Sequence, residues 1–200
     1  MASCTSTGRR FALKALQVSA KVSQKKIDAE IKNMERVKGL PCVIQSVGVI
    51  KSPGCSFILM PLAHGSLRDE VNKWSSPRLS EGDLRKVARP ILVGIAGMHS
   101  RNIIHCDIKE HNVLLMGPLE EGKGMPGLCV ADVGCSEVVG REGRRAGTEG
   151  YAAPEVVKGQ PYGLHADLFS YGAMIYKLFY KTLPFENGGW DEALSFPPVG

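Results

Sequence analysis

Residues 105–112 form a polar run next to short apolar segments, and this run constrains the fold more than any other feature of the chain. The apolar segments 113–116 and 128–131 follow it. If the two segments pair as an antiparallel hairpin, Asn112 and Asp132 lie side by side at its end. Amide and carboxylate oxygens suit Mg²⁺, which commonly takes one or two protein ligands together with phosphates and waters. An ordinary polar turn is the alternative, but the spacing D-x-K-x-x-N followed by D-x-G favours the metal site.

A pair of opposite charges is predicted nearer the N-terminus. Residues 10–16 alternate like a strand and place Lys14 on the same face as apolar neighbours. Residues 23–38 carry apolar side chains at helical spacing, and Glu30 falls on that apolar stripe. Each charge alone could extend into solvent, but an unpaired charge held against a core is costly, so the two together predict an ion pair. A lysine fixed by a carboxylate is a suitable point charge for a phosphate group.

The rest of the chain predicts an α+β fold with a small strand-rich lobe and a mostly helical lobe, joined near residues 60–66. The expected segments are strands at 42–50 and 56–62, a helix after the capping box 80–83, a loop at 117–127, a long surface loop at 132–155 and a buried central helix at 168–180.

Composition narrows the class of protein. The 200 residues suit one domain, and 25 basic against 20 acidic residues give a net charge of +5, too small for the dense basic patch of a nucleic-acid binder. No apolar run reaches the ~18 residues that a membrane span needs, and no secretory signal is visible. The six cysteines form no C-x-x-C pair and are read as reduced thiols. We therefore expect a cytoplasmic or nuclear protein without a nucleic-acid partner or a membrane span; its oligomeric state stays open.

Several short motifs occur in a fixed order. They are F-A-L-K at 11–14, Glu30, H-C-D at 105–107 with Asn112, D-V-G at 132–134, G-T-E-G-Y at 147–151, A-P-E at 153–155 and D-L-F-S-Y-G at 167–172. In this order and spacing they resemble the eukaryotic-type protein kinase domain of the Ser/Thr class. The resemblance implies a two-lobed kinase-like fold and transfer of the ATP γ-phosphoryl group to Ser/Thr hydroxyls of protein substrates.

The resemblance also implies a role for each charged residue. Lys14, paired with Glu30, would hold the α/β-phosphates of ATP. Asp107 would accept the substrate hydroxyl proton, and Lys109 would neutralise charge on the transferred group. Asn112 and Asp132 would bind Mg²⁺. The residues implied for the adenine pocket are Ala12, Leu59 as gatekeeper, Met60 to Leu62 as hinge, and Leu114.

The chain departs from the family pattern in several places. The Gly-rich phosphate loop and the last helices are missing, so residues 1–200 are expected to form a partial domain truncated at both ends, with about 1–62 and 66–200 as its lobes. Val133 replaces the usual Phe, and Glu155 is expected to lack its usual Arg partner. Cys106 replaces the usual Arg, which predicts little dependence on phosphorylation of Thr148 or Ser136.

Two other functions stay open at this point. A pseudokinase-like fragment would bind nucleotide or protein without turnover, and the missing Gly-rich loop favours it. A small-molecule kinase of related fold is the weaker alternative, because the G-T and A-P-E motifs belong to peptide-substrate architecture.

Overall fold

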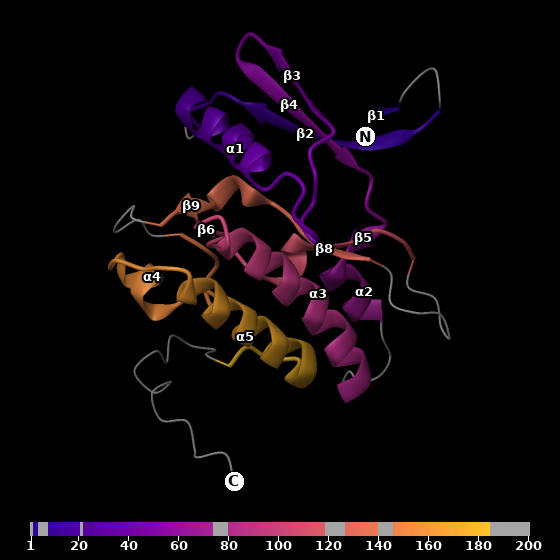
Figure 1. The fold of residues 1–200 in the computed structure, drawn as a ribbon, viewed down its shortest axis with the longest axis vertical. Coiled ribbons are helices and arrows are strands. Elements are labelled where there is room, and N and C mark those ends of the chain that lie inside the picture. The colour runs from indigo at the N-terminus through magenta and orange to yellow at the C-terminus, as the bar shows by residue number, and fades with distance from the viewer. Residues whose placement is uncertain are drawn as a thin grey trace.

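A four-stranded antiparallel sheet and one helix form the small lobe, the upper part of the molecule in Figure 1. The structure is a computed structural model that describes residues 2–3, 8–20, 22–73, 80–118, 127–139 and 146–184. The sheet has the order β1-β2-β4-β3, with β1 (Ala2–Ser3), β2 (Arg10–Gln17), β3 (Gly48–Ser52) and β4 (Cys55–Pro61). Strand β2 confirms the strand predicted at 10–16, and a turn joins β3 to β4 through Gly54 at φ +72°.

Helix α1 (Gln24–Arg36) confirms the helix predicted at 23–38. Ser23 caps it by accepting a hydrogen bond from the Lys26 backbone N–H, which satisfies a donor that the first turn leaves without a partner. Ile27 and Met34 on its apolar stripe are buried in a cluster that also contains Ile58 of β4. This packing holds α1, and with it Glu30, beside the sheet.

The strand predicted at 42–50 is wrong for its first half. Only Gly48–Ser52 is a strand, and the segment before it docks on the other lobe: the Cys42 carbonyl accepts from the Val130 N–H over 2.8 Å. The approach is so close that a Cβ on Gly94 would lie 2.6 Å from that carbonyl oxygen. The apolar run therefore resembles a strand in sequence, although it is a loop from α1 to β3 that packs on the large lobe.

The large lobe consists mainly of helices. They are α2 (Leu67–Lys73), α3 (Glu81–His99), α4 (Pro154–Lys158) and α5 (His165–Tyr180), and α3 and α5 run side by side in Figure 1. The predicted capping box is confirmed, because the Ser80 hydroxyl accepts from the Asp83 backbone N–H. The core between the helices includes Val87, Ile91, Ile95, Met174 and Leu178.

Helix α5 is buried on one face and leaves apolar side chains exposed on the other. Ala173 and Met174 are buried, but Leu168, Tyr176 and Tyr180 are exposed. Only one face of α5 therefore packs into the core among the described residues.

Two small sheets lie between the lobes. One has the order β5-β7-β8, with β5 (Gly65–Ser66), β7 (Val113–Leu115) and β8 (Leu128–Val130); the other pairs β6 (Ile103–Ile104) with β9 (Glu137–Val138). Two 3₁₀ turns, η1 (Glu110–Asn112) and η2 (Val133–Cys135), complete this region. The predicted hairpin is confirmed, but its register places Asn112 opposite Ala131, whose N–H donates to the Asn112 carbonyl over 2.8 Å. Asp132 therefore follows the residue that pairs with Asn112 and does not itself pair with Asn112.

The long surface loop predicted at 132–155 is also wrong in part. This segment contains η2 and β9, and Glu137, Tyr151 and Ala153 are buried. Although the segment is rich in glycine, its apolar residues Ala152 and Ala153 pack in a core cluster with Cys106. The arginines at 141, 144 and 145, most of the predicted loop at 117–127 and the chain beyond 184 lie outside the described residues. Within the described part, no helix is long and apolar enough to cross a membrane.

Candidate active site

Lys14, Glu30 and Asp132 meet where the two lobes face each other. The Lys14 Nζ lies 2.6 Å from Glu30 Oε1 and 2.6 Å from Asp132 Oδ1, which joins β2, α1 and the segment after β8. The predicted pair of Lys14 with Glu30 is confirmed, and Asp132 joins it. The Lys14 side chain remains 34% exposed, more than its position on an apolar strand face suggests. The ammonium group is therefore fixed by two carboxylates and still accessible.

The charges in this group stabilise one another. Burial alone would lower the pKa of Lys14, but the carboxylates of Asp132 and Glu30 outweigh it and raise the pKa of Lys14 above its usual value. Burial alone would raise the pKa of Asp132, but the Lys14 ammonium outweighs it and lowers that pKa. Lys14 is thus a cation and Asp132 an anion near neutral pH.

Backbone geometry explains the glycine of the D-V-G motif. Asp132 has the left-handed conformation, with φ 64° and ψ 67°, and its side chain accepts a hydrogen bond from the Gly134 N–H. A Cβ on Gly134 would lie 3.0 Å from Glu30 Oε2 and 3.2 Å from Asp132 Oδ1. A residue without a side chain leaves room for both carboxylates beside Lys14.

Asp107 is the centre of a second polar group. Asn112 Nδ2 donates to Asp107 Oδ2 over 2.9 Å, and the Lys109 Nζ lies 2.8 Å from the same oxygen. The Thr148 hydroxyl donates to Asp107 Oδ1 over 2.6 Å and accepts from the Lys109 Nζ over 2.6 Å. Asp107, Lys109 and Asn112 come together as predicted. Thr148 was expected only as part of a peptide-positioning loop.

The contact of Thr148 depends on the glycine before it. Gly147 has φ +81°, and a Cβ there would lie 2.7 Å from the Cys106 carbonyl oxygen. The segment that carries Thr148 can therefore approach residues 105–112, the candidate catalytic loop, closely only with glycine at this position. The G-T dipeptide was the sequence signal for this contact.

A buried aspartate on α5 binds the backbone of the candidate catalytic loop. The Asp167 side chain is 1% exposed and accepts from the backbone N–H groups of His105 over 2.8 Å and Cys106 over 2.9 Å. His99 Nε2 lies 2.8 Å from the same carboxylate. No sequence motif marks His99. It contacts the Asp167 carboxylate. In the sequence, Asp167 is marked only as the first residue of the D-L-F-S-Y-G motif.

His105 connects the two polar groups. Its Nδ1 accepts from the Asp107 N–H over 3.2 Å, and its Nε2 lies 2.9 Å from the Ala131 carbonyl. These partners assign the ring proton to Nε2, because a carbonyl can only accept. The imidazole therefore links the backbone of Asp107 to the backbone of Ala131, the residue before Asp132.

The thiol of Cys106 is buried and unsuited to binding an anion. Burial, and then the negative charge of Asp167, raises the pKa of Cys106 to about 12. Its Sγ lies 3.9 Å from the Tyr162 hydroxyl, which donates to Glu137 over 3.1 Å. The position that the family pattern fills with a cation thus holds a neutral group.

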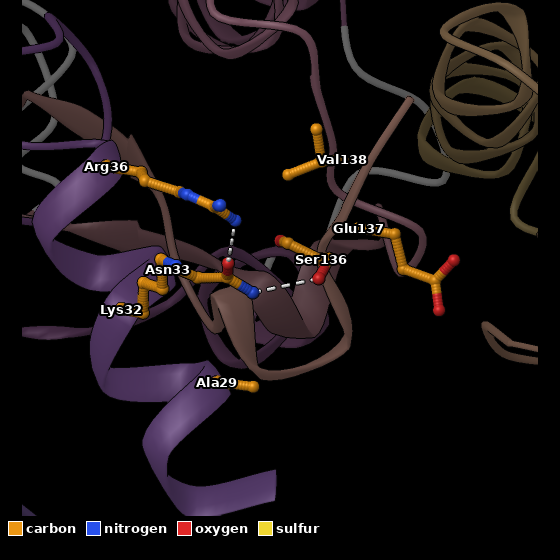
Figure 2. Close-up of a pocket in the computed structure, with 7 residues that line it drawn as sticks. All are labelled: Ala29, Lys32, Asn33, Arg36, Ser136, Glu137 and Val138. Atoms are coloured by element: carbon orange, nitrogen blue, oxygen red, sulfur yellow. Dashed lines mark hydrogen bonds between the residues drawn. The ribbon is translucent and has the colours of Figure 1, made fainter. Parts of the chain in front are cut away.

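Helix α1 is tied directly to the segment after Asp132. Asn33, a buried polar residue that the sequence did not mark, donates from Nδ2 to the Ser136 carbonyl over 2.8 Å and to the Val133 carbonyl over 3.3 Å. Figure 2 shows this amide and Arg36 at a small pocket between α1 and β9.

The side chain of Val133 is buried. Although valine is smaller than the phenylalanine usual in the family, it still packs in the core.

The apolar residues expected around adenine lie on neighbouring elements. Ala12 of β2 pairs with Met60 of β4. Met60 and Leu114 are half-buried and pack against the same core cluster. Leu59 and Leu62 are half-buried as well. Apolar side chains of intermediate exposure thus occur at all the predicted positions.

The side-chain oxygens of Asn112 and Asp132 are suitable ligands for a magnesium ion. Asn112 uses Nδ2 for Asp107, which leaves its Oδ1 as an acceptor. The contacts of Asp132 with Lys14 and Gly134 both use Oδ1, and Oδ2 is the second acceptor. An amide and a carboxylate oxygen suit an ion that completes its shell with phosphate and water. Among the described residues, no three His, Cys, Asp or Glu side chains group as a self-sufficient metal site.

Glu155 of the A-P-E motif, expected to lack the usual arginine of the family, is contacted by a histidine. His165 Nε2 lies 3.1 Å from Glu155 Oε1, and the His165 side chain is 67% exposed. This contact joins the start of α4 to the start of α5.

Comparisons with known proteins agree with this geometry. The protein kinase domain family matches residues 1–195. The chain is 34% identical over 182 residues to calcium-dependent protein kinase 6 of Plasmodium berghei, with 86% of this chain and 12% of that protein covered. It is 32% identical over 191 residues to the SNF1-related protein kinase catalytic subunit alpha KIN12 of Arabidopsis thaliana, with 90% and 36% covered. Human serine/threonine-protein kinase D3 is 29% identical over 150 residues, with 74% and 16% covered. The chain thus spans between 12% and 36% of the length of these relatives.

Proposed function

The chain belongs to the protein kinase family, and on that premise we propose that it transfers the γ-phosphoryl group of ATP to Ser and Thr hydroxyls of protein substrates. The observation that carries the proposal is the meeting of two polar groups. Lys14, Glu30 and Asp132 form one, and Asp107 with Lys109 is the centre of the other. Asn112 contacts Asp107 and pairs with the residue before Asp132.

Asp107 is proposed as the group that receives the proton. It accepts hydrogen bonds on both oxygens and its side chain is 13% exposed, so its orientation is fixed while one edge stays accessible. As the substrate hydroxyl oxygen bonds to the γ-phosphorus, the bond from that phosphorus to the ADP oxygen breaks and the hydroxyl proton passes to Asp107.

Two lysines are proposed to hold the phosphates. Lys109, between Asp107 and Thr148, places a positive charge where the transferred group carries negative charge. Lys14 would contact the α/β-phosphates, with Glu30 keeping its ammonium in place. Asn112 and Asp132 would hold Mg²⁺, which when bound neutralises charge on the phosphate oxygens.

The experiment compares the wild-type chain with Asp107→Asn in a phosphorylation assay with Mg·ATP and Ser/Thr peptides. The amide keeps the size of the side chain and cannot take the proton, so we expect transfer to fall by about 10²- to 10⁴-fold. Nucleotide binding, followed by the shift of the unfolding temperature with Mg·ATP, should persist in the variant. Equal transfer by both proteins would contradict the assigned base. Nucleotide binding without transfer by the wild type would favour the pseudokinase-like alternative.

A further inference from the structure

The proposed mechanism does not use a charged cluster that lies next to the catalytic loop. Glu110 is buried, and its carboxylate lies 2.6 Å from the Lys177 Nζ and accepts from the Tyr151 hydroxyl over 2.8 and 2.7 Å. The Lys177 Nζ also donates to the Tyr151 hydroxyl over 2.6 Å. The three residues come from η1, the segment before α4, and α5, so only the tertiary fold brings them together.

This cluster fixes a lysine that can still make one more contact. An ammonium group has three N–H donors, and Glu110 and Tyr151 receive two of those of Lys177. The Lys177 side chain is 32% exposed. Burial alone would raise the pKa of Glu110, but the contacts with Lys177 and Tyr151 lower it, so the carboxylate stays ionised and keeps the ammonium in place. One donor is thus available to a ligand from solvent.

The cluster lies within reach of a peptide bound at Asp107. Glu110 follows Lys109 directly, and Tyr151 is three positions after Thr148; Lys109 and Thr148 both contact Asp107. Consecutive Cα atoms are about 3.8 Å apart, so Glu110 is at most about 11 Å from Asp107 along the backbone. With the side chains added, an extended peptide covers this distance in about five residues or fewer.

Further cations lie near the cluster. The Arg68 guanidinium contacts the His111 ring. Burial, and then the charges of Arg68, Lys109 and Lys177 against the opposing Glu110, lowers the pKa of His111, as expected beside several cations. The nearby carboxylate of Asp69 accepts from the Ser66 hydroxyl over 2.6 Å. Glu110, the counter-charge of Lys177, is buried and faces inward.

We propose that Lys177 is a specificity-determining residue that binds an anionic side chain of the substrate, a carboxylate or a phosphorylated residue, within about five positions of the acceptor. This inference rests on the proposed function and names its substrate class: Ser/Thr sites with an acidic neighbour. A fixed ammonium with an available donor discriminates by charge, because a neutral side chain leaves that donor without an anion.

The test uses a set of peptides with one Ser acceptor and a single Glu moved through the five positions on either side. Each is matched with the corresponding Gln peptide, and phosphoserine replaces Glu in a further set. At one or two positions we expect kcat/KM for the Glu peptide to exceed that for the Gln peptide by about three- to tenfold. The phosphoserine set shows whether a phosphate serves as well as a carboxylate.

The variant Lys177→Gln should bring the Glu/Gln ratio close to one, and Lys177→Arg should restore it. Because Lys177→Gln leaves Glu110 buried without its cation, the double variant Glu110→Gln with Lys177→Gln provides a second, charge-balanced test, with its fold checked by thermal unfolding. A Glu preference that survives in the folded double variant would overturn the inference. Phosphorylation without any preference for acidic peptides would overturn it and leave the proposed function standing. No transfer to any peptide would overturn both.

Discussion

The Thr148 hydroxyl donates a hydrogen bond to Asp107 Oδ1 over 2.6 Å, although the two residues are 41 positions apart in the sequence. The same hydroxyl accepts from the Lys109 Nζ over 2.6 Å. The segment after β9 therefore takes part in orienting Asp107, the candidate base. This hydrogen bond couples the position of that segment to the position of the Asp107 side chain.

Replacing Thr148 tests this coupling. Thr148→Val keeps the shape but removes the hydroxyl from between Asp107 and Lys109, so we expect kcat to fall by about ten- to a hundredfold with little change in KM for ATP. Thr148→Ser keeps the hydroxyl and should stay within about threefold of the wild type. Steady-state kinetics with a Ser peptide measures both. A Val variant as active as the Ser variant would show that the hydrogen bond is dispensable.

Glu30 is predicted to act through Lys14. Glu30→Gln removes one of the two carboxylates that hold the Lys14 ammonium, while Asp132 remains. We expect KM for ATP to rise by about tenfold, because the lysine is less firmly placed for the phosphates. Glu35→Gln on the same helix is the matched control, since Glu35 is exposed and lies 3.8 Å from Lys38 on the surface. An equal effect of both substitutions would point to a general loss of negative charge.

The contacts of Glu110 predict a loss of stability in acid. Its pKa is lowered from the ordinary value of 4.5, so the ionised carboxylate stabilises the folded state above about pH 4.5. That contribution decreases as the pH falls through the lower folded-state pKa. Glu110→Gln should lower the free energy of unfolding by about 1–3 kcal/mol at neutral pH and by less at about pH 3.5. Urea unfolding at several pH values measures this; a difference that does not change with pH would contradict it.

Two glycines in helices should respond to alanine in opposite directions. A Cβ on Gly94 would lie 2.6 Å from the Cys42 carbonyl oxygen, so Gly94→Ala forces the loop between α1 and β3 to move and should cost about 1–3 kcal/mol. Gly172 of α5 has no atom within 4 Å of that position, so Gly172→Ala should stabilise the protein by about 0.5–1 kcal/mol. Urea unfolding compares them; a stabilised Gly94→Ala variant would mean that the lobes are not in close contact there.

Much of the candidate site could be predicted because its signals are local. Strand β2 and helix α1 follow from alternation and helical spacing, and an unpaired Lys14 or Glu30 would be costly enough to predict their ion pair. The order of Asp107, Lys109, Asn112 and Asp132 along the chain indicated the catalytic loop. The strand and the helix are predicted from the spacing of neighbouring apolar residues. The ion pair and the polar loop are predicted because a charged residue has few stable environments in a protein core.

Other parts of the site could not be predicted in this way. Asn33, Asp167 and Lys177 each bond at least one partner about 60 or more positions away, and no local period marks them. The segment 132–155 was predicted as a surface loop because its glycines and charges hide the side chains that become buried. The hairpin register was off by one residue, because Val113 pairs with Val130 and not with Ala131, and the apolar pattern of two short strands does not fix their register.

The order and spacing of its charged motifs were enough to assign the family, the two-lobed α+β class and the residues that could hold phosphate and metal. Only the folded chain decided that Thr148 meets Asp107, that Cys106 is a buried neutral thiol, and that Lys177 is held at the edge of the catalytic loop by Glu110 and Tyr151. The physical reason is that helix and strand periods record contacts between near neighbours. Hydrogen bonds between distant segments depend instead on how whole elements pack, which no short stretch of sequence encodes.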